Sequence, residues 1–331
     1  MLETASDLKA ERVGGYRPAQ AGDGAHPVFQ WPPKPVAAIR WLFGFPGYLW
    51  PWSTFFALLA FLLWRLLAMD APRSPSLGWT AGLLGVNLGL LILFAGTWHV
   101  RLYARKSQGT NYKYNSRWLS ANNSTFLFNN QLWDNVFRCL VSAVPIWTAY
   151  ELVTLWLFAH GYIRTVSWRA HPVYCLLLLL LIPMWLQVHF YAIHRLIHWG
   201  PLYRSVHYIH HKNANFGPWS GLAMHPAEHL LLFSGVMLLW IVPSTPIHAL
   251  FLLLVYGLGP ALDHQGFARV QITNGVTLNT DHYTHYLHHK YVNVNFGGDS
   301  LPIDRWLGTF HDGSDRAHEA MKSRLRGEGL R

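Results

Sequence analysis

The sequence predicts an all-α integral membrane protein, with four to six transmembrane helices and a helical cap at one membrane surface. Only 13% of the 331 residues are charged, whereas soluble domains carry about 25%. Several apolar runs approach the roughly twenty residues that a membrane-spanning helix needs. Most histidines fall in the C-terminal half of the chain, largely in polar stretches that follow these runs. We therefore expect them to lie at the membrane surface.

Charge and cysteine content narrow the class of protein further. The net charge of +10 fits a nucleic-acid-binding protein, but basic loops beside membrane helices explain it better. Cys139 and Cys175 both lie in apolar runs, so neither a disulfide framework nor a cysteine metal site is indicated. The polar N-terminus does not resemble a cleaved signal peptide, and the first apolar run is expected to act as an internal signal.

The N-terminal part divides into a flexible polar tail, residues 1–35, and a transmembrane hairpin with a basic loop, residues 36–134. The aromatic stretch 41–52 is typical of the membrane interface. Spans are expected near 53–67 and 79–97. By the positive-inside rule, the basic loop that follows lies in the cytoplasm; its cations are Arg101, Arg105, Lys106, Lys113 and Arg117.

A third span is expected near 136–159, and a fourth near 173–191 with Pro183 as a kink. Arg164 and Arg169 lie in the loop between these two spans, which is expected to be outside the cytoplasm, so they weakly oppose the orientation given by the positive-inside rule. Residues 228–259 form an apolar stretch that VPSTP, at 242–246, divides into two short arms. Either six crossings, or four plus a re-entrant hairpin, keeps all histidine sets and both termini on the cytoplasmic side. Residues 316–331 form a polar tail.

The histidines recur at helical spacing. His194 and His198 are four apart, and His207, His210 and His211 follow at i, i+3 and i+4. Residues at these separations share one helix face, so their imidazoles can grip one ion. A second array has similar spacing and consists of His282, His285, His288 and His289. Three further histidines lie between the two arrays, namely His225, His229 and His264.

The two arrays also repeat a local sequence. Residues 207–212 read HYIHHK and residues 285–290 read HYLHHK, and each is followed by a similar segment, NANFG or NVNFG. This echo predicts two similar half-sites that face a shared pocket.

So many imidazoles exceed the needs of one metal, because a catalytic zinc takes about three protein ligands and a water. A lone histidine is usually structural, but spaced sets favour a dimetal site. Nitrogen ligation without cysteine suits iron, copper or zinc. Iron is favoured because a membrane-facing site implies an apolar substrate, and attack on an unactivated C–H bond needs an oxidant made from O2 at a redox metal.

The combination of HRLIH, LYRSVHYIHH, HPAEH, DHQGF, HYLHHKYVNVNFGG and DRWLGTF over residues 135–315 resembles the sterol desaturase and fatty acid hydroxylase superfamily of membrane-bound di-iron oxygenases. The resemblance implies a catalytic domain at 135–315 and hydroxylation or desaturation of a lipid, fatty acyl or sterol-like C–H position. It also implies two irons, O2 and a separate electron donor, such as ferredoxin, cytochrome b5 or a reductase. The final box reads HY where members often carry HD, and no cytochrome b5-like domain is evident.

From the spacing and the resemblance together we predict the metal ligands His194, His198, His207, His210, His211, His264, His285, His288 and His289. His282, His225 and His229 are further candidates, and HPAEH would also suit a helix start. Three carboxylates are candidates to hold the ligand imidazoles, namely Asp263, Asp281 and Glu228. The remaining histidines considered are expected to be structural, namely His160, His171, His189, His248, His311 and His318.

Two other classes of membrane protein could use the same histidines. A metal transporter or storage protein would place its ligands at mid-membrane within broken helices, whereas here they follow the helix ends. A zinc-dependent membrane hydrolase or isomerase would act without O2, and zinc in an overexpressed iron site would be ambiguous because of mismetallation. No nucleic acid is expected as a partner. The absence of a C-terminal dilysine signal favours a bacterial inner membrane over the endoplasmic reticulum.

Overall fold

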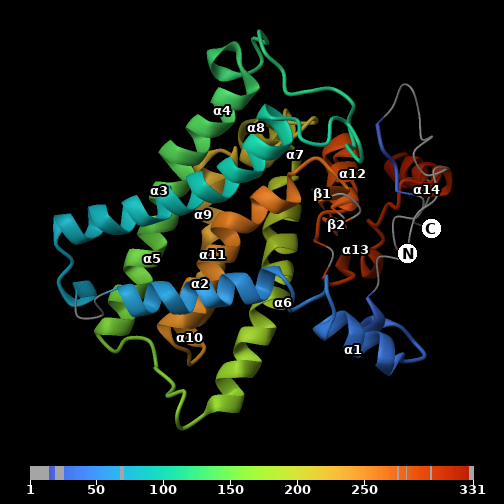
Figure 1. Ribbon diagram of the computed structural model, residues 1–331. Coiled ribbons are helices and arrows are strands. Elements are labelled where there is room, and N and C mark those ends of the chain that lie inside the picture. Colours follow the sequence, from blue (N-terminus) through green and yellow to red (C-terminus); the bar gives the residue numbers. More distant parts are fainter. Residues whose placement is uncertain are drawn as a thin grey trace.

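The protein is mostly helical, with the membrane helices on one side of the molecule and the short cap elements at one end (Figure 1). The computed structural model describes residues 15–18, 26–67, 71–273, 276–280, 282–298 and 300–327. More than half of the predicted tail, residues 1–35, therefore lies outside the described residues, and the last four residues lie wholly outside them. The helical membrane fold that the sequence predicts is confirmed.

The N-terminal region contains one interfacial helix and two longer apolar ones. Helix α1 (Pro35–Phe43) follows the 3-10 helix Pro27–Phe29 and carries exposed apolar side chains such as Phe43. Helix α2 (Trp52–Leu66) leads through a short 3-10 helix, Ala71–Arg73, into α3 (Leu77–His99). Ser76 caps α3 by accepting from the Trp79 N–H. A π-turn, Val100–Ala104, extends α3.

The middle of the chain forms two further long apolar helices. Helix α4 (Gln131–Arg138) continues through a π-turn, Cys139–Ala143, into α5 (Val144–Ala159). A 3-10 helix, Leu127–Asn129, precedes α4. Helix α6 (Pro172–Ile197) runs through Pro183 without an assigned break. In Figure 1, α5 and α6 run roughly along one direction, and α2 and α3 run across them.

The predicted apolar hairpin has unequal arms. The first arm consists of α9 (Pro226–Phe233), a 3-10 turn (Ser234–Met237) and α10 (Leu238–Ile241); the second is α11 (Pro246–Asp263). Four helical stretches are long and apolar enough to cross a membrane, namely Leu77–Ala104, Gln131–Ala159, Pro172–Ile197 and Pro246–Asp263. Trp52–Leu66 and Pro226–Ile241 are shorter apolar helices. The first predicted span is therefore the shorter α2, and both predicted arrangements of crossings stay open.

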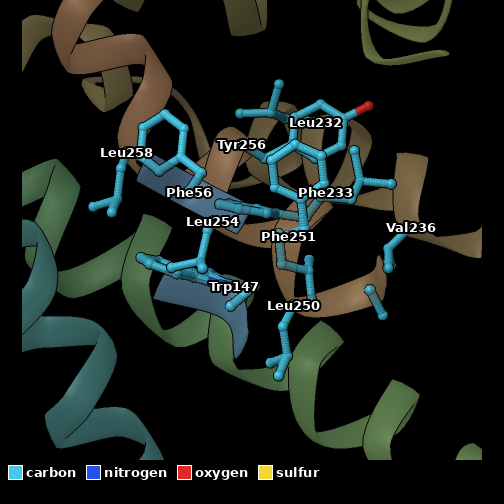
Figure 2. Packing of buried hydrophobic residues seen from close by; sticks show 14 of the residues in the cluster. Phe56, Trp147, Leu232, Phe233, Val236, Leu250, Phe251, Leu254, Tyr256 and Leu258 are labelled. Carbon is cyan, nitrogen blue, oxygen red and sulfur yellow. The ribbon is translucent and has the colours of Figure 1, made fainter. Parts of the chain in front are cut away.

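Helix α11 is the centre of the apolar core and ends at the predicted site. Of the residues in its apolar stretch, Pro246–Asp263, 72% are buried inside the protein. Trp147 of α5 stacks against Phe233 of α9, and both rings lie among the α11 side chains (Figure 2). A Cβ on Gly257 would lie 2.6 Å from the Trp147 ring, so this position has no room for a larger residue. The rigid packing fixes the end of α11, where His264 follows as C-cap.

The cap is built from short elements around the ends of α6 and α11. Its first part comprises α7 (Gly200–Leu202), a π-turn (Tyr203–His207), α8 (Tyr208–His211) and a 3-10 helix (Pro218–Leu222). Its second part comprises α12 (Tyr283–Tyr291), α13 (Ile303–Trp306) and α14 (Asp315–Leu325). The predicted polar tail 316–331 thus includes most of a helix.

One element departs from the all-α prediction. Strands β1 (Arg269–Thr273) and β2 (Val276–Asn279) form an antiparallel hairpin between α11 and α12, with Arg269 opposite Asn279. The sequence carries the signals of a hairpin, because β-branched residues flank an Asn-Gly dipeptide at 274–275. The hairpin lies directly before the second histidine array.

Candidate metal centre

Nine of the predicted histidines meet in the cap as two groups. The five-histidine group consists of His194, His198, His207, His211 and His288, whose ligand atoms all lie within 4.8 Å of one another. The four-histidine group consists of His210, His264, His285 and His289, at the same separation. The two groups use segments from the end of α6, from α8, from the end of α11 and from α12.

Each HxxHH box is divided between the two groups, which corrects the expectation that each box forms its own half-site. The box on α8 sends His207 and His211 to the five-histidine group and His210 to the other. The box on α12 does the reverse, because His285 and His289 join the four-histidine group and His288 joins the other. Residues four apart share a helix face whereas adjacent residues diverge by about 100°. Helices α8 and α12 therefore face each other and interleave their imidazoles.

Four of the nine imidazoles are held from behind through their Nδ1 atoms. Nδ1 of His194 donates to the Phe296 carbonyl at 2.6 Å, and Nδ1 of His288 donates to the Val294 carbonyl at 2.6 Å. In the four-histidine group, Nδ1 of His264 donates to the Pro260 carbonyl at 2.9 Å. A neutral imidazole that donates through Nδ1 keeps a lone pair on Nε2. These outward bonds therefore leave Nε2 free to ligate a metal.

Glu228 supplies the one predicted carboxylate contact to a ligand imidazole among the described residues. Its Oε1 accepts from Nδ1 of His207 at 2.8 Å, and both side chains are buried. A carboxylate behind a ligating histidine fixes the ring and raises the basicity of Nε2. The structure thus places Glu228 where the sequence predicted a supporting carboxylate.

The Nε2 atoms converge at distances that a metal ion would explain. In the five-histidine group, Nε2 of His207 lies 3.1 Å from that of His194 and 3.0 Å from that of His211. In the four-histidine group, Nε2 of His264 lies 3.0 Å from that of His285 and 3.2 Å from that of His289. With Nδ1 carrying the proton, such pairs are two lone pairs facing each other, which repel unless a cation lies between them.

Unpartnered buried nitrogens support the same interpretation. Neither ring nitrogen of His198, a member of the five-histidine group, has a hydrogen-bond partner. A buried polar atom without a partner costs free energy and calls for an explanation such as an ion. The donor set is all imidazole, which suits iron, copper or zinc rather than magnesium or calcium. The residues present therefore fit a dimetal centre.

Burial keeps these imidazoles in the form that ligates. Desolvation, followed by repulsion from neighbouring histidines, lowers the pKa of each buried imidazole outside the membrane segments well below its usual value; these are His207, His210, His211, His264, His285, His288 and His289. Desolvation likewise lowers the pKa of His198 to about 2. Neutral imidazole, not imidazolium, binds a metal.

The structure places the three less certain histidines outside both groups. His225 is the N-cap of α9 and accepts from the Ala227 N–H. His229 uses both ring nitrogens elsewhere, since Nε2 donates to the Leu222 carbonyl at 3.0 Å and Nδ1 lies 2.9 Å from the Ser142 hydroxyl. A histidine with both nitrogens engaged has no lone pair left for a metal.

His282 and Asp263 form a pair next to the centre. Nδ1 of His282 lies 3.2 Å from Asp263 Oδ1, so this carboxylate contacts a histidine outside both groups rather than His264. Asp281, the third predicted carboxylate, lies outside the described residues. The six histidines expected to be structural also lie outside both groups; these are His160, His171, His189, His248, His311 and His318.

Asp304 is a positioning residue that the sequence interpretation missed. Its carboxylate accepts from the N–H groups of Phe296 (2.8 Å) and Gly297 (2.7 Å), and from the Thr309 hydroxyl (2.5 Å). It thereby fixes the loop whose Phe296 carbonyl holds His194. A single acid in DRWLGTF gives no signal of this role without the fold.

A cavity of about 240 Å³ reaches the four-histidine group from the membrane side. His210, His264 and His285 line it, and none of the five-histidine group does. Phe56, Leu186 and Phe190 form part of its apolar wall. Gln187 also lines it, and a polar residue within an apolar membrane helix is a signal of function that the sequence interpretation overlooked.

Comparisons with known proteins relate the chain to lipid-modifying and sterol-modifying enzymes. Residues 177–309 match the fatty acid hydroxylase family model, and this range contains all nine clustered histidines. The chain is 25% identical over 193 residues to a Delta(7)-sterol 5(6)-desaturase of Candida glabrata, a match that covers 56% of this chain and 51% of the relative.

Two other relatives give a similar result. The chain is 31% identical over 150 residues to a methylsterol monooxygenase of Aspergillus fumigatus, covering 42% of this chain and 48% of the relative. It is 27% identical over 181 residues to a Delta(7)-sterol-C5(6)-desaturase of Nicotiana tabacum, covering 51% and 61%. The chain thus spans about half the length of the curated relatives it matches. No solved structure matches it significantly.

Proposed function

We propose that the chain belongs to the sterol desaturase and fatty acid hydroxylase superfamily and that it is a membrane-bound, O2-dependent lipid oxidoreductase. Its substrate would be a lipid, fatty acyl or sterol-like molecule from the bilayer. Hydroxylation would convert one C–H bond, O2, two electrons and two protons into C–OH and water. Desaturation would remove two hydrogens and yield two waters.

One observation carries the proposal, namely the convergence of nine imidazoles with Nε2 atoms facing one another and several Nδ1 atoms tied to carbonyls or to Glu228. Two irons bound by the five-histidine and four-histidine groups would supply redox chemistry with O2, which a C–H bond requires. Zinc would supply only Lewis acidity and activated water.

The residues of the chain have three tasks in this proposal. Phe296, Val294, Pro260 and Glu228 orient the imidazoles through Nδ1. The walls of the 240 Å³ cavity exclude water from the space in front of the four-histidine group. The same cavity holds the target carbon beside His210, His264 and His285.

We further propose that the cap faces the cytoplasm and that a separate donor, such as ferredoxin, cytochrome b5 or a reductase, supplies the electrons. The basic loop after α3, including Arg101, Arg105 and Lys106, supports this orientation. The relatives reported above are fungal and plant sterol enzymes, so they lend no support to the earlier preference for a bacterial inner membrane.

Metal analysis with an O2 assay tests the proposal. We expect about two irons per chain in protein purified from iron-replete cells, and O2 consumption when a reductant and membrane lipids are present. Lipid analysis of a host with and without the gene should show a mass gain of one oxygen or a loss of two hydrogens. Tight zinc with O2-independent turnover would favour the hydrolase alternative, and metal flux across vesicles without turnover would favour a transporter.

A further inference from the structure

A second, larger cavity lies between α2 and α6, on the side of the molecule away from the cap. It is a groove of about 910 Å³, within the size range of ligand pockets. The groove is lined by the end of α1, by α2, by the first half of α6 and by α11. Leu58, Phe61, Leu176 and Leu180 are typical of its walls. We call this cavity the α2–α6 groove.

The α2–α6 groove offers a ligand almost nothing but hydrocarbon. Ser53 and Thr54 are the only hydroxyl-bearing side chains in its lining. Both hydroxyls are already used, because Ser53 donates to the Tyr48 carbonyl at 2.7 Å and Thr54 donates to the Leu49 carbonyl at 2.8 Å. Trp64 and Trp168 add one indole N–H each, and that of Trp168 is itself buried. A molecule seated there must therefore present a mainly apolar segment, since most polar groups would lose their water without gaining a partner.

The α2–α6 groove adjoins the cavity at the metal centre. Ser53 lines both, and along α6 the lining passes from Leu180 of the groove to Pro183 of the smaller cavity. The smaller cavity, at 240 Å³, holds only about eight groups of water size, at about 30 Å³ each. It is too small for a whole membrane lipid, so most of such a molecule must lie elsewhere.

The two cavities also differ in polarity along this path. On the cap side of the smaller cavity lie Asp263, His282 and Thr284, whereas the groove is apolar. Leu176 of the groove and Phe190 of the smaller cavity are fourteen residues apart on α6, or about 21 Å at 1.5 Å per residue. A molecule that spans both cavities is therefore long, with a polar head and an apolar tail.

We propose that the α2–α6 groove binds the hydrocarbon tail of the substrate, which enters sideways from the bilayer with its polar head leading toward the cap. This inference rests on the function proposed above and adds the orientation. The carbon that reacts then lies nearer the head than the end of the tail. Ser53 marks the junction, and the Tyr48 hydroxyl ties it to α6 by donating to the Leu180 carbonyl at 2.6 Å.

Photolabelling under anaerobic conditions tests the inference without any turnover. The probe is 1-hexadecanol with a diazirine at the far end of its chain, incubated with the purified full chain in lipid nanodiscs. Mass spectrometry of the peptides locates the label. We expect it to concentrate on residues 49–64 and 173–180, which line the groove. Label spread evenly over lipid-facing helices, including α3, would overturn the proposal.

Matched variants sharpen the result. Ala57→Phe fills the groove, whereas Ala81→Phe makes the same change on an exposed position of α3. We expect Ala57→Phe to reduce groove labelling about tenfold, because the added ring would displace about two methylene groups of the probe, and their burial accounts for about a tenfold difference in affinity. Ala81→Phe should leave it unchanged. Equal losses in both variants would show that the groove is not the binding site.

A second pair of variants distinguishes a substrate tail from an ordinary bilayer lipid. Ser53→Phe blocks the junction, and Ser53→Ala removes the same hydroxyl without adding bulk. If the head must reach the cap, Ser53→Phe should lower groove labelling about tenfold while Ser53→Ala leaves it near wild type. Unchanged labelling in Ser53→Phe would mean that only bilayer lipid occupies the groove. Because the assay needs no oxidation, it can fail while the oxygenase assay succeeds, and the reverse.

Discussion

The five-histidine group and the four-histidine group lie side by side in the cap, and the cavity of about 240 Å³ reaches the four-histidine group alone among the described residues of the two. His210, His264 and His285 line this cavity, whereas the five-histidine group is largely enclosed by protein, with four side chains buried and His198 half-buried. The number of ligands also favours access to the four-histidine group, because four imidazoles would leave more positions open on a six-coordinate metal than five would. The two sites are therefore unequal, and the four-histidine group is the one built to meet an external ligand.

The groups also differ in how they are supported. A carboxylate, Glu228, holds His207 of the five-histidine group, whereas the Pro260 carbonyl holds His264 of the other group. A carboxylate donates more electron density to its histidine than a neutral carbonyl does. If both groups bind metals as proposed, this arrangement would hold the metal of the enclosed group more strongly.

The largest effect is expected from removing one ligand of either group. His288→Ala and His289→Ala change adjacent residues of α12 that belong to different groups. Each variant, like His207→Ala, should lose all measurable activity while staying in the membrane, because both metals are needed for the reaction proposed above. Metal analysis should show about one ion lost per chain in each variant.

Two results would contradict that prediction. Full activity in His207→Ala or His288→Ala would refute the assignment of these residues as ligands. Loss of both ions in both variants would show that the groups form one cooperative unit rather than two unequal sites.

A smaller effect is expected from the carboxylate behind the five-histidine group. Glu228→Gln keeps the shape of the side chain and an acceptor oxygen but removes its charge. Metal affinity or activity should fall about 10–100-fold, the usual cost of altering such a partner. Titration with a competing chelator measures the affinity. Asp263→Asn serves as the control, because Asp263 contacts His282 and not a clustered histidine, and it should leave metal affinity near wild type.

Spacing and the family resemblance together predicted the nine histidines that cluster, but they also offered His282, His225 and His229, which lie outside both groups. For the boxes the signal is local. Spacings of three and four residues place imidazoles on one helix face in α6, α8 and α12 whatever the rest of the fold does. The division of each box between two groups could not be predicted, because it depends on how α8 and α12, far apart in sequence, face each other. The same holds for Asp304, whose role arises from a loop contact across the cap.

The membrane part shows the same limit. Apolar runs correctly indicated α3, α5 and α6 as long helices, because hydrophobicity over about twenty residues is a local property. Helix α11 was expected as a short arm of a hairpin, but with 18 residues it is also long enough to cross a membrane. Whether the shorter α2 crosses the membrane depends on its packing against α11 and on its tilt, which no local pattern determines. The β1–β2 hairpin was missed for another reason, since an Asn-Gly signal was present and was not weighed against the helical expectation.

A third experiment tests directly which group is open. Azide added to the cobalt-loaded protein should change the visible absorption spectrum, because it can occupy an open metal position that faces the cavity. The azide-dependent change should persist in His198→Ala, which alters the five-histidine group. It should weaken about tenfold or more in His285→Ala, which removes a cavity-facing ligand. The opposite pattern would mean that the enclosed group is the accessible one.

A weaker effect is expected at Asp304, which acts on the five-histidine group through the protein backbone. Asp304→Asn replaces a buried carboxylate that accepts from two backbone N–H groups and a hydroxyl. We expect a loss of about 1–3 kcal/mol in the free energy of unfolding and a modest loss of metal from the group that contains His194. Thermal unfolding of detergent-solubilised protein measures the first quantity. Asp312→Asn is the control, since Asp312 accepts from the exposed Ser314 N–H.

The smallest effect is expected at His318, which tests where the metal centre ends. This histidine lies on α14, with its ring 5.2 Å from that of Tyr291 and 6.1 Å from that of His311, and it belongs to neither group. His318→Ala should keep its metal content and activity near wild type and lower the free energy of unfolding by about 1 kcal/mol or less, because a half-buried ring with contacts to two other rings is lost. Loss of either metal in His318→Ala would show that α14 takes part in the centre, and the contrast between an enclosed and an open group would then have to be redrawn with a third segment.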